Sequence, residues 1–225
     1  MSEADLVRQL KRAEERVERA SRALAPKHKG GEWEEFEAAH DDLLRLERAL
    51  ASHRGESFAE PLDFPVRWDI GAPLPHLVQS DNATYLAFYL GPQAGASQDG
   101  SVGYGEPQVV DSRADDALAI VRFDGCVSTQ MGDPNDEVFQ GHPLYGRGLQ
   151  GYRPMVVRNS AWINQLQAIN SVHSMYDPSR WTDLNHYFFG FHDSTFECVA
   201  RSFEVEIMNT SMSDALRKMC ERLVE

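Results

Sequence analysis

The stretch from residue 185 to 207, NHYFFGFHDSTFECVARSFEVEI, limits the folds open to this chain more than any other segment. Two runs of aromatic and aliphatic residues flank Asp193 and Ser194, whose side chains hydrogen-bond nearby backbone groups and so favour a tight turn. Such runs on both sides of a turn predict an antiparallel β-hairpin over about residues 186–201. We therefore expect a mainly antiparallel β-sheet.

Side chains alternate between the two faces of a strand, so the position of the turn sorts the hairpin into two surfaces. With Asp193 and Ser194 as the loop, Gly190 lies opposite Glu197, and one face is typical of a core: Tyr187, Phe189, Phe191, Phe196, Cys198 and Ala200. The second face carries His186, Phe188, Gly190, His192, Thr195, Glu197, Val199 and Arg201. A four-residue loop keeps the other pairings, whereas a three-residue loop would rearrange the faces.

His192 and Glu197 are the candidate catalytic residues on this second face. A glutamate opposite a glycine has open space above it, and the histidine lies on the diagonal, which suits acid–base chemistry. Thr195 and His186, on the same face, are candidate ligand-binding residues. The alternative is a solvent-facing sheet surface on which these side chains have no special role.

The segment from 132 to 153 is too rich in Gly, Pro, Asp and Asn for a helix or a regular strand. Its large apolar residues predict a loop packed against the body, and packed loops often form binding sites. His142, Tyr145 and Arg147 are its candidate ligand-binding residues, because a guanidinium between two glycines can approach a carboxylate or phosphate. The alternative is that Arg147 pairs with an acidic residue of this same chain.

Metal and cysteine chemistry receive little support from the sequence. His142, His186, His192 and Glu197 would form a metal site only if the 132–153 segment folded over the sheet, and zinc signatures such as His-Glu-x-x-His or Cys-x-x-Cys are missing. We predict no metal site, and the pattern indicates no particular cofactor. The three cysteines are expected to be small buried hydrophobic residues: Cys126, Cys198 and Cys220.

Two amphipathic helices precede this body. Apolar residues at spacings of three and four follow a Ser2–Asp5 cap, and a second helix runs from about Glu32 to His53. We expect an antiparallel helical hairpin over 1–54 and a β-rich α+β body over 55–225. Packing of the hairpin within the monomer and homodimerisation through it both remain open.

The body should contain further strands and helices around a proline-rich link at 55–76. Apolar runs predict strands at 84–90, 117–124 and 155–158, and helical periodicity predicts helices near 160–171 and 213–224. Five glycines within 91–107 predict a loop there. The fold class is therefore α+β, with helices packed on the sheet.

The charge is −13 overall and unevenly distributed. Residues 1–54 carry 12 acidic and 11 basic side chains, whereas 55–225 carry 23 acidic and 11 basic ones. Because residues 55–225 are strongly negative, they repel phosphate backbones, and nucleic acid is not an expected partner. With no apolar run long enough for a membrane span, a charged N-terminus and only three cysteines, we predict a cytoplasmic protein.

Three strings resemble an uncharacterised family of bacterial proteins that carries similar strings in the same order. They are GHPLYGRGL at 141–149, VRNSAWI at 157–163 and FHDSTFECVA at 191–200. The resemblance covers about residues 120–205. It implies that these segments form one unit, and it carries no activity.

Two functions fit these observations. In the first, the protein binds a small polar or anionic ligand between the 132–153 segment and the hairpin, with acid–base chemistry at His192 and Glu197. In the second, it is a non-catalytic interaction protein, immunity or adaptor-like, that uses its acidic body against a basic partner.

Overall fold

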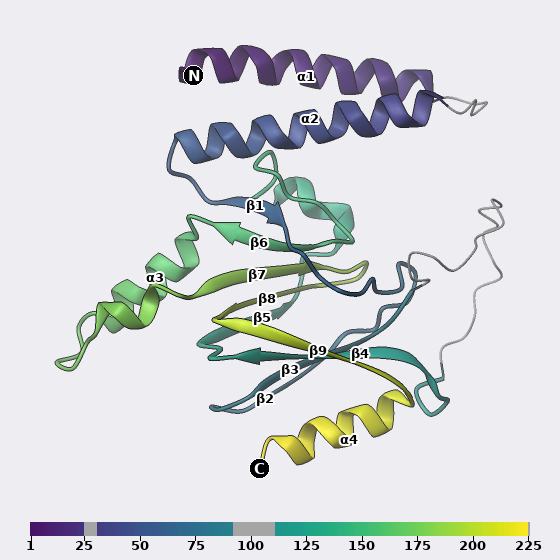
Figure 1. Ribbon diagram of the computed structural model, residues 1–225, viewed down its shortest axis with the longest axis vertical. Helices are drawn as coiled ribbons and strands as arrows, with labels where there is room; N and C mark the ends of the chain where they lie inside the picture. The colour runs from purple at the N-terminus through teal and green to yellow at the C-terminus, as the bar shows by residue number, and fades with distance from the viewer. Residues whose placement is uncertain (25–30, 92–110, 225) are drawn as a thin grey trace.

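The computed structural model describes residues 1–24, 31–91 and 111–224 and consists of two antiparallel β-sheets with helices around them (Figure 1). The first sheet has the order β1-β6-β7-β8-β5, with β1 Phe58–Pro61, β6 Pro154–Arg158, β7 Asn185–Gly190, β8 Thr195–Ala200 and β5 Ser128–Gly132. The second has the order β2-β3-β4-β9, with β2 His76–Gln79, β3 Thr84–Tyr89, β4 Asp116–Asp124 and β9 Ser202–Thr210. The predicted α+β class is confirmed. The loop expected at 91–107 lies, from residue 92 onward, outside the described residues.

The main core lies where the two sheets face each other. Phe88 and Phe123 of the second sheet meet Phe189 and Phe196 of the first, and the Phe123 ring centroid is 5.4 Å from that of Phe196. All six residues of the predicted core face of the hairpin belong to this buried cluster. The predicted sorting of side chains into two faces is therefore confirmed.

The predicted pairing of the hairpin strands, in contrast, is wrong by two residues. The chain turns at His192 and Asp193, because the Phe191 N–H donates to the Ser194 carbonyl at 2.9 Å. Gly190 then lies opposite Thr195, and Glu197 lies opposite Phe188. A slip of two residues keeps every side chain on its face, since alternation has a period of two, but it changes each neighbour across the strands.

Helix α4 (Met212–Arg222) covers the outer face of the second sheet (Figure 1). Met212, Ala215 and Met219 are buried there against residues of β3 and β4. The helix begins one residue earlier than predicted, because the Ser211 side chain accepts the Asp214 N–H and so caps the first turn.

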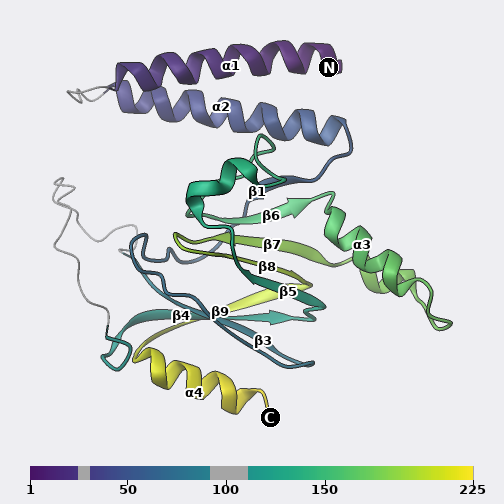
Figure 2. The same cartoon turned by 180° about the vertical axis from the view of Figure 1, so that it is seen from behind.

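The predicted helical hairpin is formed by α1 (Glu3–Ala23) and α2 (Gly31–His53), with α2 between α1 and the first sheet (Figures 1 and 2). The Ser2–Asp5 capping box starts α1 as expected. The two helices share a small core of Leu6, Ala13, Leu46 and Leu50. The helical hairpin packs on the body within the monomer, since the Gly148 N–H donates to the Glu47 carboxylate of α2 at 2.9 Å.

Three short helical elements complete the described part of the body. Ser160 caps α3 (Ala161–Asn170) by accepting the Ile163 N–H, and the 3₁₀ turn η2 (Pro178–Trp181) follows. A second 3₁₀ turn, η1 (Asp136–Gly141), lies in the glycine-rich segment. Within the described residues, every helix falls short of the length and apolarity that a membrane span requires.

Candidate functional site

The 132–153 segment packs on the outer face of the first sheet, which Figure 2 shows turned toward the viewer. Phe139 of η1 and Leu144 form a buried cluster with Met155, Val157 and Phe188 of the sheet. The apolar residues of this segment predicted that it would be a packed loop, and the structure confirms it. This packing brings the candidate residues of the segment to the same sheet face as those of the hairpin.

Gly190 does not provide the open space expected on that face. A Cβ atom at this position would lie 2.9 Å from Cζ of Phe139, so the aromatic ring fills the space above the glycine. The glycine is needed for this close approach of the 132–153 segment to the sheet. Gly190 therefore serves packing rather than ligand access.

Glu197 lies between two histidines instead of beside His192. The Nε2 atom of His186 is 2.7 Å from Oε2 of Glu197, and the Nε2 atom of His142 is 3.9 Å from Oε1. The three side chains are 7% (His186), 9% (His142) and 15% (Glu197) exposed. We call this set, His142, Glu197 and His186, the buried cluster.

The remaining nitrogens of the two histidines are also engaged. Nδ1 of His142 accepts the Leu144 N–H at 3.2 Å, and Nδ1 of His186 is 2.9 Å from the Ser160 hydroxyl. Because the Ser160 oxygen already accepts the Ile163 N–H, its own proton can go to His186, which leaves Nε2–H facing the carboxylate. The hydrogen-bond network thus assigns Nε2–H donors to both rings.

The electrostatics of Glu197 reflect this environment. Burial alone raises the pKa of the carboxyl, but the neighbouring His142 and His186 outweigh it and lower the pKa to about 2. The carboxylate therefore stays charged at neutral pH. The charged Glu197 carboxylate of β8 contacts His142 of the 132–153 segment and His186 of β7, and so joins that segment to the sheet.

His192 belongs to a second set of side chains at the turn of the hairpin. Its Nδ1 atom is 3.1 Å from Oδ2 of Asp136 and 3.0 Å from the Tyr152 hydroxyl, which donates to the same carboxylate. Backbone bonds fix both partners: the Asp136 N–H donates to the His192 carbonyl, and the Tyr152 N–H donates to the Gly190 carbonyl. We call Asp136, His192 and Tyr152 the turn cluster.

The turn cluster is more open to solvent than the buried cluster. The His192 side chain is 44% exposed, while Asp136 is 17% exposed. The hydrogen bond to Asp136 raises the pKa of His192, and the hydrogen bond from Tyr152 lowers the pKa of Asp136. Burial and the neighbouring Asp136 raise the pKa of Tyr152 to about 12, so the phenol remains protonated.

The other predicted site residues are not brought to either cluster. Nε of Arg147 is 3.3 Å from the Glu56 carboxylate, which matches the alternative in which Arg147 pairs within the chain. Tyr145 is 60% exposed on the surface of the same segment. Thr195 is buried, and its hydroxyl donates to the Gly132 carbonyl at 3.5 Å. Within residues 1–24, 31–91 and 111–224, the structure contains no group of three or more His, Cys, Asp or Glu side chains that could hold a metal ion.

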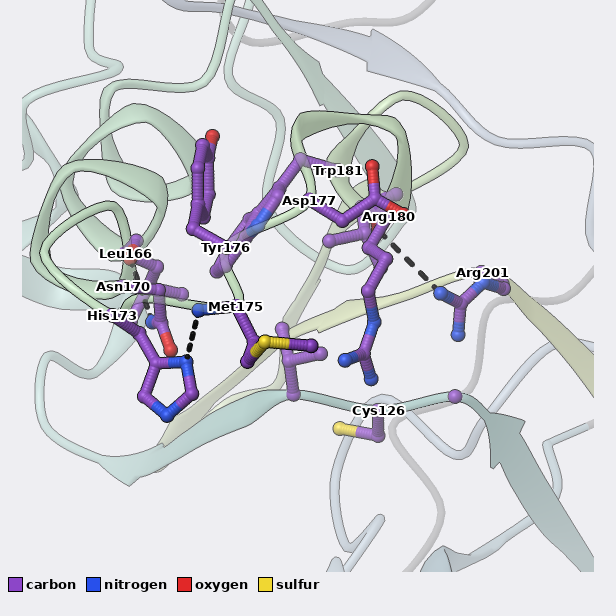
Figure 3. A pocket seen from close by; sticks show the side chains of 13 residues that line it. Cys126, Leu166, Asn170, His173, Met175, Tyr176, Asp177, Arg180, Trp181 and Arg201 are labelled. Carbon is purple, nitrogen blue, oxygen red and sulfur yellow. Dashed lines mark hydrogen bonds between the residues drawn. The ribbon is translucent and has the colours of Figure 1, made fainter.

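A cavity of about 390 Å³ lies elsewhere, between the α3–η2 region and the turn that joins β4 to β5 (Figure 3). Its lining includes Cys126, His173, Met175, Arg180 and Arg201.

Cys126 is half-buried and Cys220 is exposed, so the expectation of three buried cysteines is wrong for these two, and only Cys198 is buried. Cys126 follows the end of β4, where the chain leaves the sheet, and α4 leaves Cys220 open to solvent.

The sequence pattern missed Asp136, Tyr152 and Cys126. Asp136 follows Asn135 and opens a 3₁₀ turn, a local signal for a cap rather than for a catalytic partner. Tyr152 has a φ of +57°, which nothing in its side-chain type indicates. Asp136 and Tyr152 meet His192 because the 132–153 segment folds over the sheet. The spacing of residues along the chain does not predict that path.

No match to this chain was found among protein-family models, curated proteins or solved structures.

Proposed function

We propose that the protein binds a small polar or anionic ligand where the 132–153 segment meets the turn of the hairpin, and that His192 exchanges a proton with it. The observation that carries this proposal is the geometry of His192. Asp136 and Tyr152 hold its Nδ1 side, while the side chain remains 44% exposed to solvent. Its Nε2 atom lies 3.9 Å from the carboxylate of Asp193, which is exposed. A histidine oriented by a carboxylate through one nitrogen, with the other nitrogen open to solvent, suits general acid–base work.

The electrostatics favour the proton-donating form. Because Asp136 raises the pKa of His192, the imidazolium is more populated near neutral pH than in a free histidine. The imidazolium can attract an anionic ligand and donate the Nε2 proton to it. Tyr152, protonated, donates to Asp136 and so keeps the carboxylate oriented toward the ring.

Glu197 takes a positioning role in this account. Its contacts to His142 and His186 fasten the 132–153 segment, and with it Asp136 and Tyr152, to the sheet. Direct participation of Glu197, His142, His186 and Thr195 in ligand binding remains a prediction. The same is true of Tyr145 and Arg147, which lie on the same segment.

The test is a titration of isotopically labelled protein, followed by NMR, with a panel of small carboxylates and phosphate monoesters. We expect at least one compound to shift the imidazole resonances of His192. His192→Gln should weaken that binding by about tenfold or more, as expected when a charged hydrogen bond is lost. Gln130→Ala, an exposed change beside Glu197, is the control that should leave binding unchanged.

A panel that leaves His192 unperturbed, or a ligand that His192→Gln binds equally well, would favour the second function. That function, a non-catalytic interaction protein with a basic partner, is supported by the excess of acidic residues over 55–225. Homodimerisation through the helical hairpin and a cytoplasmic location also remain predictions. Sedimentation of the purified protein would test the first of these.

A further inference from the structure

Cys126 and Cys198 meet at the edge of the inter-sheet core. Cys126 lies just before β5, where the Val127 N–H donates to the Val199 carbonyl at 2.8 Å and holds the chain beside β8. Its side chain packs against the core cluster that contains Cys198, and the two thiols are near enough for each to shift the pKa of the other. The two sulfur atoms are therefore neighbours, although the residues are 72 positions apart in the sequence.

The two thiols differ in access. Cys126 lines the cavity of about 390 Å³ and is half-buried, whereas Cys198 is fully buried among aromatic residues. A small molecule in the cavity can reach Cys126, whereas Cys198 is buried and does not line the cavity. This order suits a site with one attacking thiol and one that reacts second.

The cavity also holds a positive charge. Figure 3 shows the guanidinium of Arg180 extending into the cavity on the side of Cys126, and among the residues that the structure describes it lies within 4.0 Å of no carboxylate. Arg201, in contrast, pairs with Asp183 at 2.9 Å. The hydrogen bond from Cys198 outweighs burial and lowers the pKa of Cys126 to about 7, while burial raises the pKa of Cys198. Partly exposed cysteines near a positive charge are the reactive ones in proteins.

We propose that Cys126 and Cys198 form an oxidant-reactive dithiol site that takes a small hydroperoxide in the cavity and closes to a disulfide. The Cys126 thiolate attacks one peroxide oxygen, the O–O bond breaks, and the departing oxygen leaves as hydroxide and takes a proton. This step gives a sulfenic acid on Cys126. The Cys198 sulfur then loses its proton and bonds to the Cys126 sulfur, and the sulfenic oxygen leaves with that proton as water. Two thiols are oxidised, and one hydrogen peroxide is reduced to two waters.

The experiment uses the full chain with Cys220→Ser, so that only the two proposed thiols remain. One equivalent of hydrogen peroxide is added to the folded protein, free thiols are counted, and a non-reducing digest is analysed by mass spectrometry. We expect both thiols to be lost together and a single peptide pair joined through Cys126 and Cys198. Arg180→Gln should slow the reaction about threefold or more, because thiolate formation loses a nearby positive charge. Arg217→Gln on α4, which removes one positive charge elsewhere, should not slow it.

Two results would overturn the proposal. The first is that both thiols stay free at one equivalent of peroxide. The second is that Cys126 accumulates a sulfinic acid while Cys198 stays reduced. Cys198→Ala adds a further check, since a dimedone adduct should then appear on Cys126. If that core substitution unfolds the protein, the peptide analysis of the Cys220→Ser protein decides alone.

Discussion

The buried cluster and the turn cluster contain the same kinds of groups but use them differently. In the buried cluster, Glu197 is hydrogen-bonded to His186 and lies 3.9 Å from His142, and the Nδ1 atoms of both rings are also hydrogen-bonded. In the turn cluster, Asp136 and Tyr152 hold only one nitrogen of His192, and the ring is 44% exposed. The rings of the first arrangement are buried, whereas Nε2 of His192 belongs to a half-exposed side chain and lies 3.9 Å from the exposed Asp193 carboxylate.

This difference separates a structural role from a chemical one. A buried carboxylate that is satisfied on every side stabilises the fold around it, and its removal leaves the partners unpaired. A half-exposed histidine contributes little to stability but can exchange protons with solvent or a ligand. Substitutions in the two clusters should therefore have opposite consequences, large for stability in one and large for chemistry in the other.

Glu197→Ala should have the largest effect on stability. It leaves two buried imidazoles without their acceptor, and breaking a buried pair in this way costs about 3–5 kcal/mol. Urea unfolding measures the loss. Gln130→Ala, at the exposed position opposite Glu197, should change the free energy of unfolding by less than about 0.5 kcal/mol. Equal effects of the two substitutions would show that the buried cluster does not hold the segment.

The pH dependence of that stabilisation follows from the pKa of Glu197. Its pKa is lowered from 4.5 to about 2 in the folded protein, so its contribution is complete above pH 4.5 and is lost as pH falls toward 2. The full difference corresponds to about 3 kcal/mol. Unfolding of the wild type and of Glu197→Gln at a series of pH values checks it. The gap between the two proteins should narrow across this window, and a gap independent of pH would mean that the carboxylate is not the stabilising form.

Gly190→Ala should have an intermediate effect. The new methyl group would meet the Phe139 ring at 2.9 Å, and overpacking of this kind costs about 1–3 kcal/mol. Gly141→Ala, in the same segment with no atom within 4 Å of its Cβ position, is the matched control and should be neutral. Phe139→Leu should recover part of the loss in the Gly190→Ala protein. The absence of such coupling in a double-mutant cycle would argue against the contact.

Asp136→Asn should have the smallest effect on stability and a clear effect on His192. Removal of the carboxylate should lower the pKa of His192, which an NMR titration of its imidazole measures directly. Since that pKa is raised in the folded protein, the small stabilisation it provides is present at low pH and disappears as pH rises through the folded value. Glu137→Gln removes a neighbouring charge without a hydrogen bond to the ring and should shift the titration less.

The sequence predicted the fold where local patterns decide it. The two faces of the hairpin, the capped start of α1 and the packed 132–153 segment all follow from periodicity, turn chemistry and apolar content. The short polar strand β5, Ser128–Gly132, has no such pattern, because it forms at a sheet edge by pairing with β8. Its existence depends on pairing with a distant segment, since Ser128 lies opposite Val199, 71 residues further along the chain.

The sequence predicted the types of residue in the candidate site but not which side chains contact one another. Placing the turn one residue too late moved the pairing by two, which put Glu197 beside Gly190 instead of Phe188. The groups that His192 meets, Asp136 and Tyr152, come from a segment whose path over the sheet is set by the Phe139 contact with Gly190. Alternation within one hairpin carries no information about such long-range contacts.

The most direct test of the division between the two clusters is the rate at which diethyl pyrocarbonate modifies each histidine in the folded protein. Peptide mass spectrometry resolves His142, His186 and His192, and the reaction is run at a series of pH values because the reagent modifies the neutral ring. We predict rapid modification of His192 and strong protection of His142 and His186, because their side chains are buried and three of their four ring nitrogens are hydrogen-bonded. Modification of His142 or His186 as fast as that of His192 would contradict the account.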